Sequence, residues 1–328
     1  MKNNLLFSLI LILFVSTSQA QGFKFDKEAY AKRETVETPR GPIPDYASLK
    51  RFTPIIYPQA VGDCVAQSFA NALTVLMAKN NHMTDQNKIT LMRPSPFFIY
   101  WSTKEPGDSY CEEGLDAEKA ALFLLNKGTV GMIDVEYPNH YPFTSNVLCN
   151  DYPPSYSTDL LNASKLKPSN IYRIETLSDI RVALANGMPV VIGMAVPSSF
   201  YECKSYVWTP RSTDNIADSY GHAMTIIGYD DNLYGGTFEV MNSWGEDWGI
   251  NGFTRIRYKD AADWIVAGWA VENKTTTVYR YDGEFEAKQD ILAPDNEMLK
   301  IYSESRNDTL SVNPFFQRTD LEELLDFE

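Results

Sequence analysis

The chain has 328 residues, of which 44% are hydrophobic and 22% are charged, so it is long enough for one large globular domain or two smaller ones. Its 29 Lys plus Arg and 43 Asp plus Glu give a net charge of -14. This charge repels phosphate backbones and anionic lipid surfaces, so we expect neither nucleic acid nor a membrane as a partner. The sequence contains no zinc-type cysteine and histidine spacing and no phosphate-binding glycine loop, so we expect no metal and no cofactor.

The N-terminus predicts export. Lys2 precedes an apolar run from Leu5 to Val15, and Ser18-Gln19-Ala20 then offers the small residues that a signal peptidase recognises. The run is too short to span a bilayer comfortably, which disfavours the alternative of a membrane anchor. We therefore expect residues 1–20 to be a signal peptide and the mature protein to be secreted or periplasmic.

An extended N-terminal arm is expected over residues 21–44, which are polar and contain three prolines. A helix is expected directly after Cys64, because apolar residues from Val65 to Met77 recur at helical spacing. Two further helices are expected at Asp116–Asn126, before Gly128, and at Ser178–Asn186.

The later part of the chain has the pattern of β-strands. The predicted strands are Val190–Val196, Ala223–Tyr229, Thr237–Asn242 and Phe253–Tyr258. Helices followed by strands indicate an α+β fold, with a helical part at about 60–155 and a β-rich part at about 165–272 of one domain over 45–272. Residues 273–328 form an acidic C-terminal extension, with 6 basic and 13 acidic side chains in 274–328.

His222 is the histidine whose surroundings suggest chemistry. It opens the apolar strand that precedes the turn-rich segment 230–236, whereas His82 and His140 lie in polar or proline-bounded loops. A hairpin centred near residue 232 brings Asn242 beside His222, within a residue or two of register. We expect the Asn242 amide oxygen to accept a hydrogen bond from Nδ1–H and to fix the imidazole tautomer.

Cys64 is the candidate nucleophile. A helix N-terminus and a nearby imidazolium both lower a thiol pKa, so we expect an ion-paired thiolate. The Cys64 backbone N–H and the Gln59 side-chain amide are the candidate donors to an oxyanion. Four cysteines in an exported chain also allow two disulfides that include Cys64, and cysteine parity alone does not exclude that alternative.

Three segments carry a resemblance to a known family. Residues 58–66 (PQAVGDCVA), 221–229 (GHAMTIIGY) and 241–253 (MNSWGEDWGINGF) resemble the papain-like cysteine peptidases, peptidase C1. The resemblance covers roughly 45–272 and implies a helical left subdomain, a β-barrel-like right subdomain and an active-site cleft between them. It also implies that Cys64, His222 and Asn242 are catalytic and that Gln59 and Cys64 form the oxyanion hole.

The same resemblance extends to residues around this centre. Trp244 matches the tryptophan that shields the histidine–asparagine contact, and a Cys111–Cys149 disulfide is implied. The segment 111–114 (CEEG) stands where the family has a cysteine followed by paired glycines, with Glu113 in place of one glycine. The implied substrate cleft consists of Glu113, Gly114, Gly221, Ala223 and Trp244.

The sequence thus predicts an exported, monomeric cysteine peptidase that cleaves proteins or peptides through a thioester acyl-enzyme. The alternatives are an inactive papain-like peptide-binding protein and a transamidase or other acyl-transfer enzyme. The N-terminal arm is shorter than the inhibitory propeptide usual in the family. The apolar patch Val312–Phe316 of the acidic extension is therefore a candidate inhibitor, although such a tail more often only keeps a protein soluble.

Overall fold

The computed structural model describes residues 22–37, 41–59, 61–132, 149 and 166–274, together with the backbone of two short strands at 277–279 and 285–287. The predicted signal peptide at 1–20 lies outside these residues, as do His140 and the patch Val312–Phe316.

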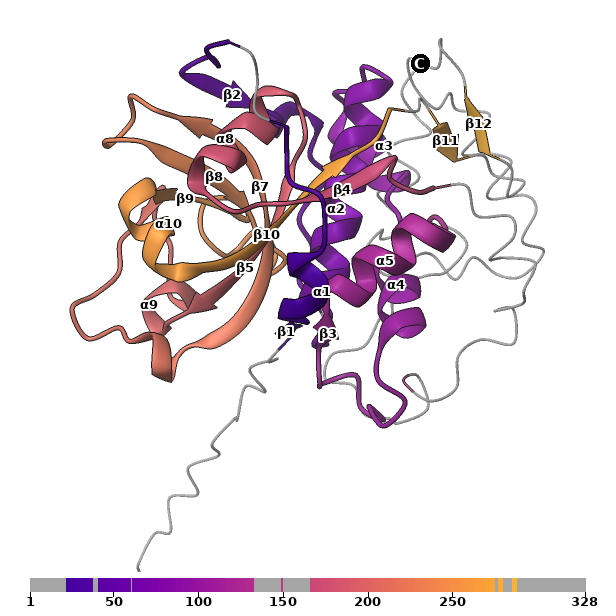
Figure 1. Cartoon of the computed structure of the whole chain (residues 1–328), viewed down its shortest axis with the longest axis horizontal. Helices are drawn as coiled ribbons and strands as arrows, with labels where there is room; N and C mark the ends of the chain where they lie inside the picture. Colours follow the sequence, from indigo (N-terminus) through magenta and orange to yellow (C-terminus); the bar gives the residue numbers. More distant parts are fainter. Residues whose placement is uncertain are drawn as a thin grey trace, which may run out of the picture.

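The described part of the chain has a helical half and a β-rich half, which lie side by side in Figure 1. Its helices are α1 (Lys27–Ala31), α2 (Cys64–Asn80), α3 (Gln86–Leu91), α4 (Pro96–Thr103), α5 (Ala117–Lys127), α8 (Leu177–Ala185), α9 (Ser198–Tyr201) and α10 (Tyr258–Trp264), with 3-10 turns η1 (Lys50–Phe52) and η2 (Ile216–Asp218). Its strands are β1 (Phe23–Lys24), β2 (Tyr46–Ser48), β3 (Leu115–Asp116), β4 (Asn170–Arg173), β5 (Val190–Val196), β6 (Val207–Trp208), β7 (Tyr220–Asp230), β8 (Thr237–Met241), β9 (Phe253–Arg257), β10 (Ile265–Glu272), β11 (Thr277–Tyr279) and β12 (Phe285–Ala287).

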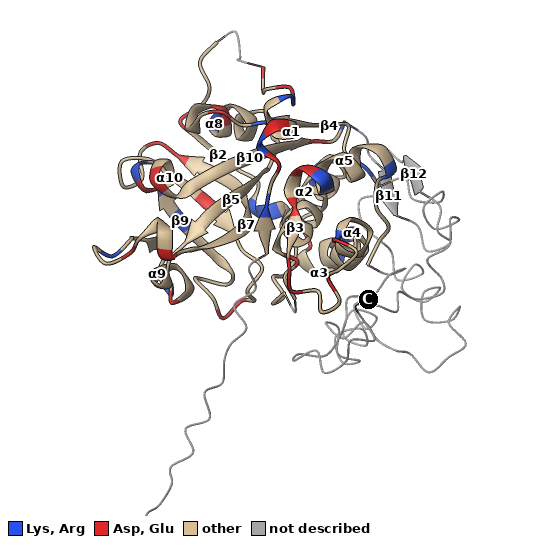
Figure 2. Cartoon of the chain, turned by 60° about the horizontal axis from the view of Figure 1, so that its bottom comes forward, with Lys and Arg blue, Asp and Glu red and all other residues tan. Residues whose placement is uncertain are grey.

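One eight-stranded sheet forms the β-rich half. Its strands follow the order β4-β10-β5-β7-β8-β9-β6, and β2 pairs with β7 beside this path. All of these pairings are antiparallel except that of β6 with β9. Strands β5 and β7 are almost free of charged residues, as Figure 2 shows, because both of their faces are covered.

The central helix α2 joins the two halves. Fifteen of its 17 residues are buried, so it is apolar or neutral on nearly every side rather than amphipathic. It packs against α4 and α5 on one side and against β7 on the other. The Thr225 hydroxyl of β7 donates to the Ser68 carbonyl of α2 at 3.0 Å, and this hydrogen bond links the helix directly to the sheet.

The α+β architecture expected from the sequence is confirmed. The helix after Cys64 begins at that residue, and the helices expected at 116–126 and 178–186 are α5 and α8, each displaced by one residue at both ends. The extended arm expected at 21–44 instead contains the helix α1, which Asp26 caps by accepting from the Glu28 and Ala29 N–H groups.

The charged residues lie mainly on loops and outer helix faces (Figure 2). Within the described residues, no helix combines the length and the apolar character that crossing a bilayer requires.

Candidate active site

Cys64 occupies the first position of α2, at the interface between the helical half and the sheet. Its side chain is fully buried, and its sulfur lies 3.4 Å from the Ala223 backbone nitrogen of β7, which donates to it. The four N–H groups of a helix N-terminus carry partial positive charge, which favours a negative sulfur at this point. The helix therefore positions the sulfur and places partial positive charge beside it, which favours the thiolate form.

His222 and Asn242 meet across the hairpin formed by β7 and β8. The ladder pairs Thr225 with Met241, two residues from the register expected from the sequence, and Asn242 follows the last paired residue of β8. The Asn242 Oδ1 lies 2.8 Å from Nε2 of His222, in a buried environment. The expectation that Asn242 binds Nδ1 is therefore wrong, because the Asn242 oxygen binds Nε2.

Two contacts hold this pair in place. The Ser243 backbone N–H donates to the same Asn242 oxygen at 2.8 Å, so the amide cannot turn without losing two bonds. Trp244 stacks on the imidazole, with ring centroids 4.4 Å apart and the planes inclined by 26°. Tyr201 of α9 also stacks on the indole, with ring centroids 4.7 Å apart. The result is a layered aromatic wall beside His222.

Gln59 lies on the loop before α2 and is tied to the segment after β8. Its amide nitrogen donates to the Val61 carbonyl at 2.8 Å, and its amide oxygen accepts from the Ser243 hydroxyl at 2.7 Å. Its backbone N–H also donates to the Ser243 carbonyl at 2.7 Å. These contacts use one of the two hydrogens of its amide group.

The site is closed to solvent, and this decides its protonation state. Burial raises the pKa of the Cys64 thiol from 9.0 to about 12, against the Ala223 N–H, which lowers it. Burial lowers the pKa of His222 from 6.5 to about 4, against the Asn242 hydrogen bond, which raises it. Both shifts favour the neutral thiol and the neutral imidazole in the covered site, whereas the sequence predicts an ion pair.

The residue that covers the thiol is Gly22, which the sequence analysis did not single out. A Cβ placed on Gly22 would lie 2.4 Å from the Cys64 sulfur, so the glycine backbone rests directly on it. Gly114 and Gly221 line the same segment, because a Cβ on Gly114 would meet the Gly22 carbonyl at 2.5 Å and one on Gly221 the Phe23 carbonyl at 2.9 Å. The two aromatic residues at 23 and 25 of an otherwise polar arm were the available sequence signal.

The other residues expected in the cleft differ in their distance from Cys64 and His222. Ala223 touches the thiol through its N–H, and Trp244 contacts His222. Glu113 is exposed on the loop before β3.

One disulfide joins Cys111 to Cys149, with their Cα atoms 5.7 Å apart. It fastens the loop before β3, because the Cys111 carbonyl also accepts from the Gly62 N–H at 2.9 Å. Cys64 and Cys203 are free and buried, which leaves Cys64 as a thiol. Among the described residues, no three His, Cys, Asp or Glu side chains gather in a way that could hold a metal ion.

Known proteins resemble this chain in sequence. The profile of the papain family cysteine proteases matches residues 99–273, which include His222 and Asn242 and are more than half of the chain. An uncharacterized peptidase C1-like protein of Acanthamoeba polyphaga mimivirus is 29% identical over 232 residues, 66% of this chain and 69% of that protein. Mouse pro-cathepsin H is 29% identical over 154 residues, which are 44% of this chain and only 40% of that protein.

Solved structures share the fold. Xylellain, a cysteine protease from Xylella fastidiosa, superposes with a TM-score of 0.62 at 20% identity, over 77% of this chain and 96% of xylellain. A procathepsin B from Trypanosoma congolense gives a TM-score of 0.62 at 18% identity, over 80% of this chain and 90% of its own. At these identities the likeness concerns the fold.

Proposed function

Since the chain belongs to the papain family of cysteine proteases and is thus a cysteine-type peptidase, we propose that it hydrolyses peptide bonds through Cys64, His222 and Asn242. The observation that carries the proposal is the contact of three chain segments at one point. A helix-terminal thiol lies against the Ala223 N–H, and the neighbouring His222 has its far nitrogen bound by Asn242. A nucleophile, a base and an orienting amide are the parts that acyl transfer requires.

The first half of the reaction forms a thioester. When a substrate site is open and solvated, the Cys64 proton passes to Nδ1 of His222, and the resulting thiolate attacks the carbonyl carbon of the peptide. The negative oxygen that forms is bound by the Cys64 backbone N–H and the free amide hydrogen of Gln59. The imidazolium then returns its proton to the leaving nitrogen, the C–N bond breaks, and the amine product departs.

Water completes the cycle. His222 takes a proton from a water molecule, and the hydroxide adds to the thioester carbonyl. The C–S bond then breaks to release the carboxylic acid, and the imidazolium returns its proton to the departing sulfur, which restores the thiol. Asn242 keeps the imidazole ring in the orientation that both thioester formation and thioester hydrolysis require. Its oxygen can bind Nε2–H in the neutral and in the protonated ring.

The substrates are proteins or peptides, and the cleft runs along Gly114, Gly221 and Ala223, with Trp244 and Glu113 at its edges. The signal peptide proposed for residues 1–20 sends the enzyme outside the cytoplasm, where the Cys111–Cys149 bridge is stable. We also propose that it acts as a monomer.

The direct test measures hydrolysis of a fluorogenic dipeptide amide before and after an epoxide thiol inhibitor. The proposal expects turnover that the inhibitor abolishes in proportion to the Cys64 it alkylates. Inhibitor binding without any turnover would indicate a peptide-binding protein, and transfer to an added amine that exceeds hydrolysis would indicate a transamidase. Either result would contradict the proposal.

A further inference from the structure

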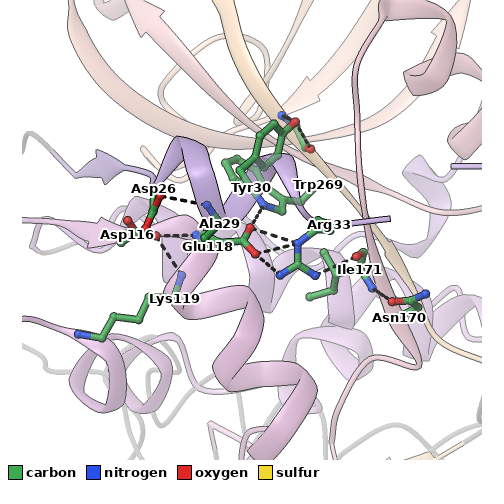
Figure 3. Close-up of polar contacts among 11 residues, drawn as sticks. Asp26, Ala29, Tyr30, Arg33, Asp116, Glu118, Lys119, Asn170, Ile171 and Trp269 are labelled. Carbon is green, nitrogen blue, oxygen red and sulfur yellow. Dashed lines mark hydrogen bonds and ion pairs between the residues drawn. The ribbon is translucent and has the colours of Figure 1, made fainter. Parts of the chain in front are cut away.

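Asp63, the N-cap residue of α2, does not cap its helix. Three other helices follow an aspartate, at Asp26, Asp85 and Asp116, and these aspartates have an extended backbone with ψ between 109° and 116°. Their carboxylates accept from N–H groups of the first turn, and Figure 3 shows two of these caps, at Asp26 and Asp116. Asp63 instead has a ψ of 19°, and its side chain makes no capping hydrogen bond. The carboxylate at this helix end therefore points elsewhere.

The Asp63 carboxylate is held on the flank of α2. The residue is fully buried, and its Oδ2 accepts from the Nε2 of Gln67, one turn further along the helix, at 2.9 Å. Arg93, which is 4% exposed, donates to the Oε1 of Gln67 from the segment between α3 and α4. The Arg93 carbonyl accepts from the Met132 N–H at 2.8 Å, which fixes the backbone at this point. Gln67 and Arg93, here called the clamp, thus hold the carboxylate through a chain of two hydrogen bonds.

The first N–H groups of α2 act on the sulfur. Burial raises the pKa of the Cys64 thiol, and the Ala223 N–H lowers it. The Asp63 carboxylate also raises this pKa, whereas the backbone N–H groups of Val65 and Cys64 lower it. An N-cap carboxylate normally binds the N–H of the second or third helical residue, which here are Val65 and Ala66. A capping carboxylate at position 63 would therefore compete with the sulfur for the Val65 N–H.

Other elements of the described chain also bring charged or titratable side chains toward Asp63 and Cys64. They are His222 of β7, Tyr201 of α9, Tyr100 of α4 and Arg93. Burial lowers the pKa of His222 to about 4 and raises that of Tyr201 to about 12. Burial and a hydrogen bond to the Asp108 carboxylate raise the pKa of Tyr100, and the arginine keeps its charge. None of these four groups changes its charge between roughly pH 6 and pH 10, so a change in thiol reactivity over this range concerns Cys64 and Asp63.

We propose that Gln67 and Arg93 are positioning residues, which hold the Asp63 carboxylate away from the N-terminus of α2. The first N–H groups of the helix then remain available to the Cys64 sulfur and to the oxyanion. This inference rests on the nucleophilic role proposed for Cys64. Without the clamp, the carboxylate turns to the helix N-terminus, takes the Val65 N–H and disfavours the thiolate. Because the clamp acts through Asp63, its removal has no effect on the thiol of a chain that lacks this carboxylate.

The test measures the rate at which iodoacetamide alkylates Cys64 in the full chain, from about pH 6 to pH 10, with the modified cysteine located by peptide mass spectrometry. The rate follows the thiolate fraction, so a thiol pKa that is one unit higher lowers it about tenfold at a given pH below the pKa. Gln67→Met and Arg93→Met, which keep most of the side-chain volume, should each lower the rate by about this factor. Asp63→Ala alone should raise it, because a nearby negative charge is removed.

The double variant separates positioning from a structural role. Asp63→Ala with Gln67→Met should react as fast as Asp63→Ala, because no carboxylate is left to hold. Thr74→Val is the control, at a buried threonine of α2 that donates to the Ala70 carbonyl, and it should keep the wild-type rate. If Gln67→Met slows alkylation equally with and without Asp63, the clamp is only structural and the proposal is overturned. Unchanged rates in both clamp variants would overturn it as well.

Two further readouts keep the result interpretable. Label on the free, buried Cys203 reveals an unfolded variant, and Arg93→Lys then replaces it, since a lysine retains the buried cation and should slow alkylation less than Arg93→Met. Alkylation does not depend on peptide hydrolysis, so the two proposals fail separately. The expected alkylation rates without any hydrolysis support the clamp and contradict the proposed function. Hydrolysis by the wild type with unchanged alkylation in the clamp variants contradicts the clamp alone.

Discussion

The indole of Trp244 stacks on the imidazole of His222, with centroids 4.4 Å apart and an interplanar angle of 26°. This arrangement excludes water from the side of the ring that faces β8, where the Asn242 oxygen binds Nε2 at 2.8 Å. A hydrogen bond in such a low-dielectric environment is stronger than one in water. The stack therefore contributes to the orientation of His222 as well as to packing.

Trp244→Ala should lower kcat by roughly tenfold or more, because water then competes for the His222–Asn242 bond. Trp244→Phe keeps a stacked ring and should lose less. Trp264→Phe, at a tryptophan of α10 that contacts Trp208 instead, is the matched control and should retain the wild-type kcat. Steady-state kinetics on a dipeptide amide decide the point, and equal kcat values in all three variants would show that the stack has no part in orienting the histidine.

Burial of His222 predicts an acid-sensitive stability. Its pKa is about 4 in the folded chain against 6.5 for the free side chain, so below pH 6.5 the unfolded state takes up a proton that the folded state refuses. The buried neutral ring therefore lowers stability in acid: the free energy of unfolding is unaffected by this group above pH 6.5 and falls by about 3 kcal/mol as the pH drops to about 4. His222→Gln has no such proton, so urea unfolding at pH 7 and pH 4.5 should show a smaller loss than wild type. Equal losses would mean that His222 is not buried as a neutral ring.

Gln59 gives a test of oxyanion stabilisation. Gln59→Ala removes the side-chain donor and should lower kcat by about 100-fold or more, with a smaller change in KM. Because Gln59 also accepts from the Ser243 hydroxyl, Gln59→Glu serves as a control that keeps the acceptor and lacks the donor. Both variants should lose kcat alike. A full rate in Gln59→Glu would assign the residue a structural role only.

The Cys111–Cys149 bridge closes a separation of 38 residues. The double variant Cys111→Ser with Cys149→Ser should therefore lose about 3–4 kcal/mol of unfolding free energy, mainly because its unfolded chain is less restricted. Cys203→Ser, which removes a free buried thiol, is the control and should lose far less. Denaturant unfolding under non-reducing conditions measures both, and equal losses would argue against the bridge.

The elements with strong local signals were predictable from the sequence. The apolar run Val190–Val196 is a strand with those bounds, and α2 begins at Cys64 as the helical spacing indicates. The helix α4 and the strand β10 were not predicted, because α4 is an eight-residue apolar segment without clear periodicity and β10 begins at Ile265, directly after α10 ends at Trp264. Local pattern does not separate such short buried elements from loops.

The chemistry of the site was less predictable than its residues. Hairpin arithmetic placed Asn242 near His222, yet a β-bulge between Ile226 and Gly228 shifts the register, and the nitrogen that Asn242 binds depends on ring orientation. The covering of the thiol depends on contacts between Gly22 and residues almost 100 positions away, such as Gly114. No local pattern in a polar arm encodes a contact of that kind, although Phe23 and Phe25 marked it as unusual.

The nucleophilic role of Cys64 is tested most directly by covalent labelling with an epoxide thiol inhibitor during turnover. The full chain and its Cys64→Ala variant are incubated with the inhibitor, and the modified cysteine is mapped while peptide hydrolysis is followed. We predict that one inhibitor binds per chain, that it is attached to Cys64, and that residual activity falls in step with this label. Hydrolysis by Cys64→Ala at the wild-type rate, or loss of activity with the label on Cys203, would contradict the central claim.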